Sequence, residues 1–186
     1  MDVVVYKDEY RELWDEFVEN SNNGTMFHLQ QFLDYHPAGK FDWHHLMFFE
    51  KGNLKAVLPG TFENGVYESP IGASYGSLVI PDITFKETMD LVSALLDWGK
   101  KNGVKHFILT SAPMIYENFQ NQNLEFAMLW QGFNYQLHYI SSAIKLDPAR
   151  ELLPRFQSTV RRNIRKSLKD PDIRVEVNER YDQFYP

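Results

Sequence analysis

Apolar residues recur with a helical period in several parts of the chain. In the first of these parts they fall at positions i, i+3, i+4, i+7 and i+8: Tyr10, Leu13, Trp14, Phe17 and Val18. This spacing predicts an amphipathic helix. Similar patterns predict helices over residues 27–36, 85–99 and 124–130. The helix at 85–99 begins at a capping box formed by Thr84 and Glu87, and Asn102-Gly103 supplies its C-terminal stop.

Strand-like apolar runs alternate with these helices. The runs cover residues 3–6, 43–50, 54–62, 66–68, 106–110 and 133–146. Lys51-Gly52-Asn53 is a hairpin signal, and a hairpin requires antiparallel neighbours. The order of elements therefore predicts a mixed α/β (α+β) fold, with a mainly antiparallel sheet packed by flanking helices, rather than a doubly wound parallel sheet.

The last forty residues follow a different pattern. Asp147-Pro148 is typical of a helix start. Pro154 then divides this region into a short helix and a longer one, because a proline inside a helix removes a hydrogen bond and causes a clash. We expect the longer helix over residues 155–169, a strand at 173–177 and the start of another helix at 181–186.

The predicted helix at 155–169 separates its side chains by type. Its apolar residues lie within roughly 120° of arc on a helical wheel: Phe156, Val160, Ile164 and Leu168. Its cations occupy the opposite side: Arg155, Arg161, Arg162, Arg165, Lys166 and Lys169. Like charges one turn apart are destabilising, a cost that a bound anion would relieve.

We therefore predict that Arg161, Arg162, Arg165 and Lys166 bind an anion. The alternative is a solvated face that pairs with acids elsewhere in the chain.

Positive charge is concentrated in one segment of an otherwise acidic chain. The 186 residues carry a net charge of −6, yet residues 150–169 hold seven Lys or Arg and one acid, a local net of +6 that leaves −12 for the rest. Such a segment is suited to a negatively charged partner.

The absence of cysteine excludes disulfides, cysteine-ligated metals and a cysteine nucleophile. We see neither a secretory signal nor an apolar run of about 20 residues, so we expect a cytoplasmic protein without a membrane span.

A Gly/Ser/Pro-rich loop covers residues 69–77. Its glycines permit close approach of a ligand or of another part of the chain. We predict that Ser74, Tyr75 and Gly76 line a substrate cleft, and the alternative is a plain connection between strands. The loop lacks the P-loop pattern.

The six histidines are scattered, and we expect no metal site.

Three stretches together resemble the FemAB-like (methicillin-resistance-type) aminoacyltransferase family of the GNAT superfamily. They are residues 23–32, with the sequence NGTMFHLQQF, residues 69–77, with SPIGASYGS, and residues 153–177, which include TVRRNIRKSLK. The resemblance implies two tandem GNAT-like domains with a substrate cleft between them. Residues 1–146 would form the first domain and 147–186 the first elements of a second, incomplete one, so that the chain is the N-terminal part of such an enzyme.

The resemblance also implies transfer of an acyl or aminoacyl group to an amine of a cell-envelope (peptidoglycan) precursor. The donor would be acyl-CoA or an aminoacyl-tRNA, the anionic substrate would be nucleotide-linked, and no cofactor would be bound permanently. Family members that bind the cell-wall precursor have a lysine near the end of the second helix, where this chain has His36. The CoA pyrophosphate loop of simple GNAT enzymes is absent.

We expect the isolated chain to be inactive, and no catalytic base is identified. A non-catalytic module that binds nucleic acid or an anionic partner through the basic helix is the alternative function.

Overall fold

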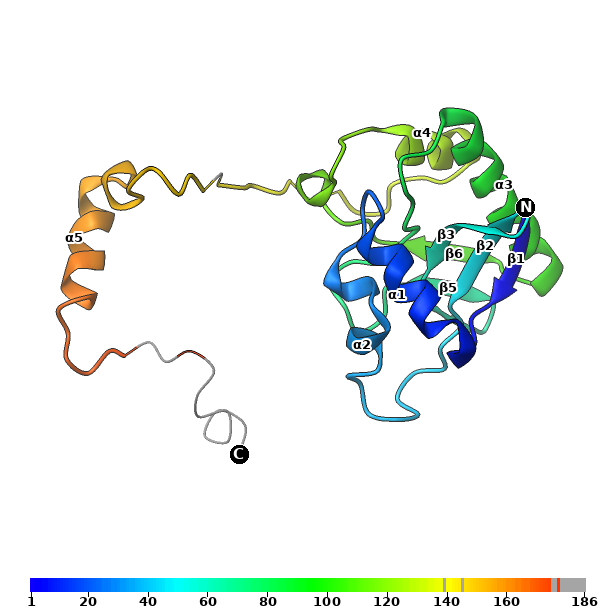
Figure 1. The fold of residues 1–186 in the computed structure, drawn as a ribbon, viewed down its shortest axis with the longest axis horizontal. Coiled ribbons are helices and arrows are strands. Elements are labelled where there is room, and N and C mark those ends of the chain that lie inside the picture. The colour runs from blue at the N-terminus through cyan, green and yellow to red at the C-terminus, as the bar shows by residue number, and fades with distance from the viewer. Residues whose placement is uncertain (139, 145, 175–176, 178–186) are drawn as a thin grey trace. The chain divides into compact units, whose positions relative to one another are not determined.

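The computed structural model describes residues 1–138, 140–144, 146–174 and 177 (Figure 1). The chain divides into two compact units, residues 1–141 and 142–186. The sequence places the division after residue 146. The correspondence of these units to two GNAT-like domains stays a prediction.

The first unit alternates helices with strands. Its elements are β1 (Asp2–Val5), η1 (Asp8–Tyr10), α1 (Arg11–Glu19), η2 (Met26–His28), α2 (Gln30–Leu33), β2 (Leu46–Glu50), β3 (Asn53–Leu58), β4 (Thr61–Glu63), β5 (Val66–Ser69), α3 (Phe85–Asn102), β6 (His106–Leu109), η3 (Met114–Tyr116) and α4 (Asn123–Trp130). Strands β1, β2 and β3 form an antiparallel sheet. In the second sheet β5 pairs antiparallel with β4 and parallel with β6. The predicted mixed α/β fold is confirmed.

Isolated bridges link the two sheets through the segment that follows the Gly/Ser/Pro-rich loop. Val57 in β3 pairs antiparallel with Val79, and Gly76 pairs parallel with Ser111, just beyond β6. The segment from Gly76 to Val79 therefore contacts both sheets, which fixes the end of the loop in the centre of the unit.

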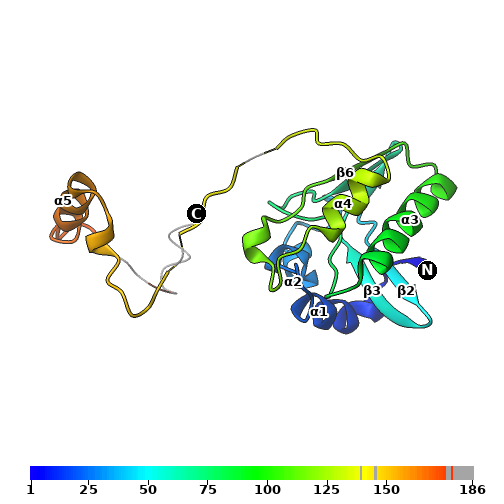
Figure 2. The ribbon, with the colours of Figure 1, turned by 90° about the horizontal axis from the view of Figure 1, so that it is seen from above.

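Successive side chains of β2 and β3 point to opposite faces of the first sheet, as the period-2 geometry of a strand requires. Both faces of this sheet are packed against other residues. Leu46 and Phe48 belong to a core cluster with α3 and α4, whereas Met47 packs with Trp14 and Val18 of α1. Figure 2 shows α3 and α4 side by side, and residues of these two helices are in contact. The first unit is thus built in three layers.

Helix α3 begins and ends where the sequence predicts. The hydroxyl of Thr84 accepts a hydrogen bond from the Glu87 N–H (3.3 Å), and Glu87 accepts one from the Thr84 N–H (2.9 Å). Gly103 ends the helix in the left-handed conformation, with φ of 77°. The bonds from Thr84, together with Lys55 at 3.1 Å, lower the pKa of Glu87 to about 2.

The strand predicted over 133–146 is wrong for the part that the structure describes. Residues 133–138, 140–144 and 146 form no strand, although the apolar residues alternate with polar ones from 133 to 138. Alternation produces a strand only where a neighbouring strand offers hydrogen bonds. Here the Tyr135 hydroxyl instead bonds to Glu125 of α4, and its ring stacks on His138.

Two other predicted elements are shorter than expected. The helix predicted over 27–36 is the turn η2 followed by α2, which ends at Leu33, and the strand predicted from residue 43 begins at Leu46.

The second unit contains η4 (Leu153–Arg155) and α5 (Ser158–Ser167). The division at Pro154 is therefore confirmed, although the longer helix begins at residue 158 rather than 155. Asp147 caps only a turn, in which its carboxylate accepts the Ala149 N–H at 3.0 Å. Ile173 and Arg174 are not in a strand, and the rest of that predicted strand, except residue 177, lies outside the described residues, as does the segment 181–186.

A pair of asparagines holds distant segments of the first unit together. Buried Asn22 accepts the Phe119 N–H at 2.7 Å and donates to the Phe119 carbonyl at 2.8 Å. Asn23 bonds to Leu78 and Ile80 in the same way, both at 2.8 Å. Each side chain thus acts like a short piece of strand backbone, which the sequence analysis missed.

Replacing Asn22 by Ala is expected to lower the free energy of unfolding by about 2 kcal/mol, because it leaves the Phe119 N–H and carbonyl without their partner. Urea denaturation measures the change. Asn134→Ala, at an exposed position, is the matched control and is expected to change stability by less than about 0.5 kcal/mol. Equal losses in the two variants would contradict this role of Asn22.

Candidate functional site

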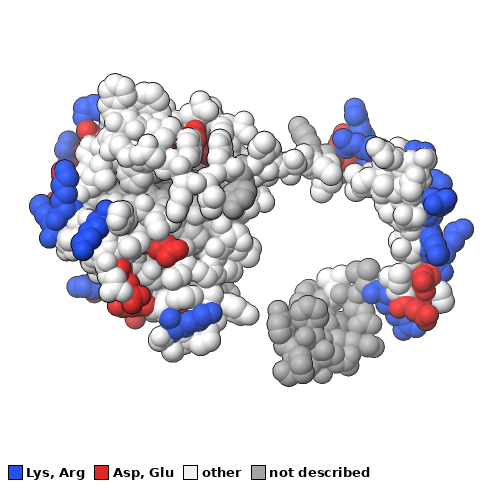
Figure 3. Space-filling view, turned by 180° about the vertical axis from the view of Figure 1, so that it is seen from behind, with Lys and Arg blue, Asp and Glu red and all other residues white. Residues whose placement is uncertain are grey.

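Helix α5 brings together the four predicted anion-binding residues. Arg161, Arg162, Arg165 and Lys166 all lie within it. They span roughly 140° of arc on the helix, and Arg161 borders the apolar side. We call these four residues the basic sector. Figure 3 shows Lys and Arg side chains gathered over this part of the second unit. The preceding turn η4 contains Pro154 and gives way to extended backbone at Phe156. Residues 158–167 contain neither glycine nor proline, so nothing interrupts the helix that follows.

The basic sector is not neutralised by acids within the described part of the chain. There, Arg162, Arg165 and Lys166 form no ion pair, and Arg161 donates one hydrogen bond, to the Pro154 carbonyl at 3.2 Å. Other arginines do find partners. Arg11 bonds to Asp34, and Arg150 lies 3.2 Å from Asp147.

The chemistry of the sector follows from its side chains. Arg162, Arg165 and Lys166 are exposed and Arg161 is half-buried. A guanidinium presents a planar fork that matches two oxygens of a phosphate, and an ammonium adds a mobile point charge. The sector can therefore bind a phosphate, a pyrophosphate or a nucleic-acid backbone.

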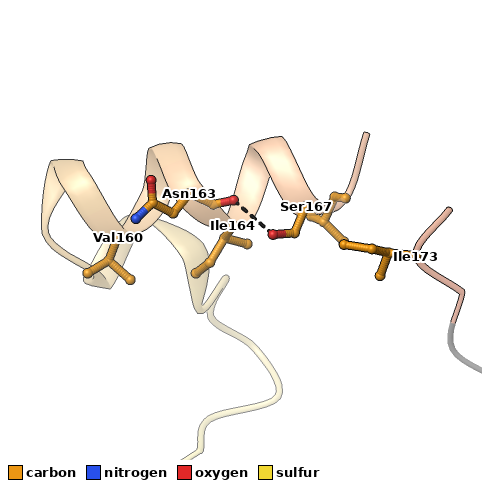
Figure 4. A pocket seen from close by; sticks show the side chains of 6 residues that line it. Val160, Asn163, Ile164, Ser167 and Ile173 are labelled. Atoms are coloured by element: carbon orange, nitrogen blue, oxygen red, sulfur yellow. Dashed lines mark hydrogen bonds between the residues drawn. The ribbon is translucent and has the colours of Figure 1, made fainter. Parts of the chain in front are cut away.

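An open groove runs along the apolar side of α5. Its volume is about 560 Å³, and its lining residues are Val160, Asn163, Ile164, Ser167, Leu168 and Ile173. In Figure 4 Val160 and Ile164 extend from the same side of the helix, and Ile173 comes from the segment that follows it. Ser167 donates to the Asn163 carbonyl at 3.2 Å, so one of the two polar side chains in the lining is used within the helix.

In the first unit His36 meets the predicted substrate loop. Its Nε2–H donates to the Gly72 carbonyl at 3.1 Å. A Cβ atom on Gly72 would lie 2.6 Å from the same nitrogen, so only glycine fits there without a shift. His36 also packs edge-on against Phe41, with ring centres 4.9 Å apart. The structure thus joins His36 to the loop, a contact that sequence spacing alone does not reveal.

The predicted loop residues have different surroundings. Ser74 is exposed, whereas Tyr75 is half-buried between Phe27 and Tyr116, at ring distances of 5.6 and 5.9 Å. Ser74 and Tyr75 of the loop are accessible, as is Tyr116 of the neighbouring η3. A hydroxyl and aromatic rings of this kind can contact a polar ligand that also has an apolar part.

Gly76 is buried and is held on both sides. Its N–H donates to the Thr110 carbonyl at 2.8 Å, and its carbonyl accepts the His28 Nε2–H at 3.0 Å. His28 is the neutral tautomer protonated on Nε2, because its Nδ1 accepts the Thr25 N–H at 3.0 Å. Burial lowers the pKa of His28. The sequence analysis missed this histidine, although its place three residues after Thr25 resembles capping-box spacing.

The predicted residues therefore form two groups, four on α5 and four at the loop, in separate units. Among the residues whose positions are described, no three His, Asp or Glu side chains are placed to hold a metal ion, and no helix is both long and apolar enough to cross a membrane.

The fold places the chain among mixed α/β proteins with a helix-covered sheet. No protein-family model matches the chain, and no curated protein sequence matches it. Solved structures similar to it include acetyltransferases. The apo aminoglycoside 6'-N-acetyltransferase AAC(6')-IG from Acinetobacter haemolyticus is 16% identical, with a TM-score of 0.43 over 79% of this chain and 100% of its own.

Two further structures are similar at the same level. AAC(6')-Iy, in complex with a CoA bisubstrate analogue, is 14% identical, with a TM-score of 0.47 over 78% of this chain and 98% of its own. A GNAT family acetyltransferase from Staphylococcus aureus is 10% identical, with a TM-score of 0.38 over 77% and 100%. Because all three TM-scores lie below 0.5, no activity is transferred from them to this chain.

Proposed function

We propose that the protein binds a phosphate-bearing substrate with α5 and takes part in transfer of an acyl or aminoacyl group to an amine. The observation that carries the proposal is the basic sector. It has four cations on one side of a helix, no acid within that helix, and no ion pair to Arg162, Arg165 or Lys166 within the described residues.

The anion is the part of the substrate that α5 recognises. Arg161 and Arg165 are one helical turn apart, as are Arg162 and Lys166, so two neighbouring phosphate groups can each meet two cations. A nucleotide-linked precursor, acyl-CoA and an aminoacyl-tRNA all carry such phosphates. The distribution of cations thus favours a ligand with at least two negative charges.

The transfer reaction is supported by the resemblance of residues 23–32, 69–77 and 153–177 to the FemAB-like family. On this proposal the acceptor is an amine of a cell-envelope precursor, and the surface of Ser74, Tyr75 and His36 contacts the acceptor, while the buried Gly76 holds the end of the loop in place. The protein contributes substrate binding, which promotes reaction by holding two reactants in the geometry that the transfer needs.

Calorimetric titration with pyrophosphate, UDP and CoA at low ionic strength tests the binding step. We expect the triple variant Arg162→Ala/Arg165→Ala/Lys166→Ala to bind the ligand that the wild type prefers about 100-fold more weakly, since each charge-assisted contact contributes on the order of 1 kcal/mol in solvent. The charge-matched control is Lys100→Ala/Lys101→Ala/Lys105→Ala in the first unit, whose side chains are exposed. It should bind as the wild type does.

Equal binding by the triple variant and the control would overturn the proposal. The alternative, a nucleic-acid-binding module, gives another result. Binding to duplex DNA would then far exceed binding to any of the three small ligands, and the logarithm of its affinity would fall with the logarithm of salt concentration by about 0.9 per phosphate contact.

A further inference from the structure

Three Asn-Gly pairs occur in the chain, at residues 23–24, 64–65 and 102–103. Asparagine is a chemically labile residue. It is most exposed to attack when glycine follows it, because glycine has no Cβ atom to shield its backbone nitrogen from the asparagine side chain. The three pairs share this local chemistry, so the fold decides which of them reacts.

Hydrogen bonds restrain the first pair. The Asn23 side chain donates to the Leu78 carbonyl and accepts the Ile80 N–H, both at 2.8 Å. The Gly24 N–H donates to the Ser21 hydroxyl at 2.9 Å. The side-chain amide and the backbone nitrogen are thus both engaged, and all three bonds must break before the two groups can meet.

The third pair is restrained by the end of α3. Asn102 is the last residue of this helix, and its side chain donates to the Trp98 carbonyl at 2.8 Å. The Gly103 N–H bonds to the carbonyls of Gly99 and Lys100. A reaction at Asn102 would therefore require the last turn of the helix to open.

The second pair forms the two-residue loop of the β4–β5 hairpin, between the paired residues Glu63 and Val66. Asn64 has a φ of 52° and Gly65 one of 84°, as in the type I′ turn that favours Asn-Gly. Asn64 is exposed, and its amide donates only a long bond of 3.4 Å, to the Glu63 carboxylate. No turn or loop carbonyl of the described residues accepts the Gly65 N–H.

We propose that Asn64 is a site of spontaneous deamidation, with water as the co-reactant. The Gly65 backbone nitrogen attacks the Asn64 side-chain carbonyl carbon and gives up its proton. A nitrogen–carbon bond forms, the bond from that carbon to the amide nitrogen breaks, and ammonia leaves with the proton. Water then opens the five-membered imide at one of its two carbonyls, which leaves aspartate or isoaspartate at position 64.

The isoaspartate product alters the backbone of the hairpin. Its main chain runs through the former side chain and is one carbon longer, so the two-residue loop no longer matches the pairing of Glu63 with Val66. The Gly65 carbonyl also accepts the N–H groups of Lys105 and His106, at 2.7 and 3.2 Å, where β6 begins. Isoaspartate at position 64 therefore loosens the sheet of β4, β5 and β6.

Mass spectrometry of peptides from the full chain, incubated at mildly alkaline pH, tests the proposal. We expect Asn64 to be converted about 100-fold faster than Asn23 and about tenfold faster than Asn102, because each hydrogen bond that must first break reduces the reactive fraction severalfold. Electron-transfer fragmentation distinguishes isoaspartate from aspartate in the product.

The same measurement in concentrated urea is the control, because unfolding removes the bonds of Asn23 and Asn102. The three sites are then expected to react at comparable rates. The proposal is overturned if Asn64 reacts no faster than the other two sites in the folded protein, or if its advantage is unchanged in urea.

The effect on the sheet is measured on the modified protein, which anion exchange separates by its added negative charge. We expect the isoaspartate form to unfold at a lower urea concentration than the wild type. Asn64→Asp adds the same charge without the extra carbon and is expected to unfold close to the wild type. Equal unfolding of the isoaspartate form and Asn64→Asp would overturn the predicted effect of the longer turn. Neither experiment depends on the proposed function.

Discussion

Lowering the pH from neutral to about 4 is expected to reduce the free energy of unfolding by about 3 kcal/mol through His45 alone. This side chain is buried beside Trp14 and Trp43, and its Nδ1 accepts the Gly60 N–H at 3.0 Å. Burial lowers its pKa from 6.5 to about 4; Asp34 opposes this shift and His44 adds to it. One pKa unit corresponds to about 1.4 kcal/mol.

The sign follows from proton binding. Below pH 6.5 the unfolded chain protonates this histidine while the folded protein does not, so acid favours unfolding until the pH reaches the folded pKa of about 4. Stability is thus full above pH 6.5 and falls between these two values. His28 and His44, whose pKa values burial also lowers, add to the loss in the same direction.

Urea denaturation at a series of pH values measures the effect. In His45→Gln the amide oxygen can still accept the Gly60 N–H, and we expect a weaker dependence on pH together with some loss of stability at neutral pH. His106→Gln, at an exposed position, is the control. If His45→Gln keeps the acid sensitivity of the wild type, the burial of a neutral His45 does not explain that sensitivity.

Gly76→Ala is expected to lower the free energy of unfolding by about 3 kcal/mol. A Cβ atom at this position would lie 2.6 Å from the Pro70 backbone nitrogen and 2.6 Å from the Ser69 hydroxyl. The chain must shift to relieve such an overlap. A shift would also weaken the hydrogen bonds of Gly76 to Thr110 and His28.

Gly39→Ala separates this steric effect from backbone conformation. Gly39 has a φ of 75°, and a Cβ atom added there would have no neighbouring atom within 4 Å, whereas Gly76 does not have a positive φ. We expect the Gly39 variant to lose only about 1 kcal/mol, the usual cost of a left-handed residue with a side chain. Thermal unfolding compares the two. A loss in Gly76→Ala no larger than this would show that the loop adapts easily.

Local patterns predicted the helices well. The capping box at Thr84 and the glycine at position 103 delimit α3, and the apolar period of residues 10–18 locates α1. These signals act between residues that are only a few positions apart. Pro154 acts in the same local way. Such features form wherever the chain supplies the right neighbours along the sequence.

Contacts between distant residues account for what the sequence did not predict. The bonds of Asn22 to Phe119 and of His36 to Gly72 join residues 97 and 36 positions apart. No spacing rule specifies such pairs. The predicted strand over 133–146 was wrong in its described part for a related reason, since alternation cannot supply the neighbour that a strand needs.

The two predicted sites illustrate the same difference. The grouping of Arg161, Arg162, Arg165 and Lys166 follows from helical period alone, and α5 bears it out. The loop composition located Ser74, Tyr75 and Gly76, but the packing of Tyr75 on Phe27 and Tyr116 required the fold. Their part in substrate binding stays a prediction for both groups.

The most direct test of anion binding by α5 is the response of individual arginine side chains to an anion. We would follow the Nε–Hε resonances of the wild-type protein by NMR during titration with pyrophosphate. The resonances of Arg161, Arg162 and Arg165 are expected to shift with a common saturation curve. Those of Arg11 and Arg150, which already pair with Asp34 and Asp147, are expected to stay in place. Uniform small shifts of all the arginines, without saturation, would contradict the assignment of α5 as the anion-binding element.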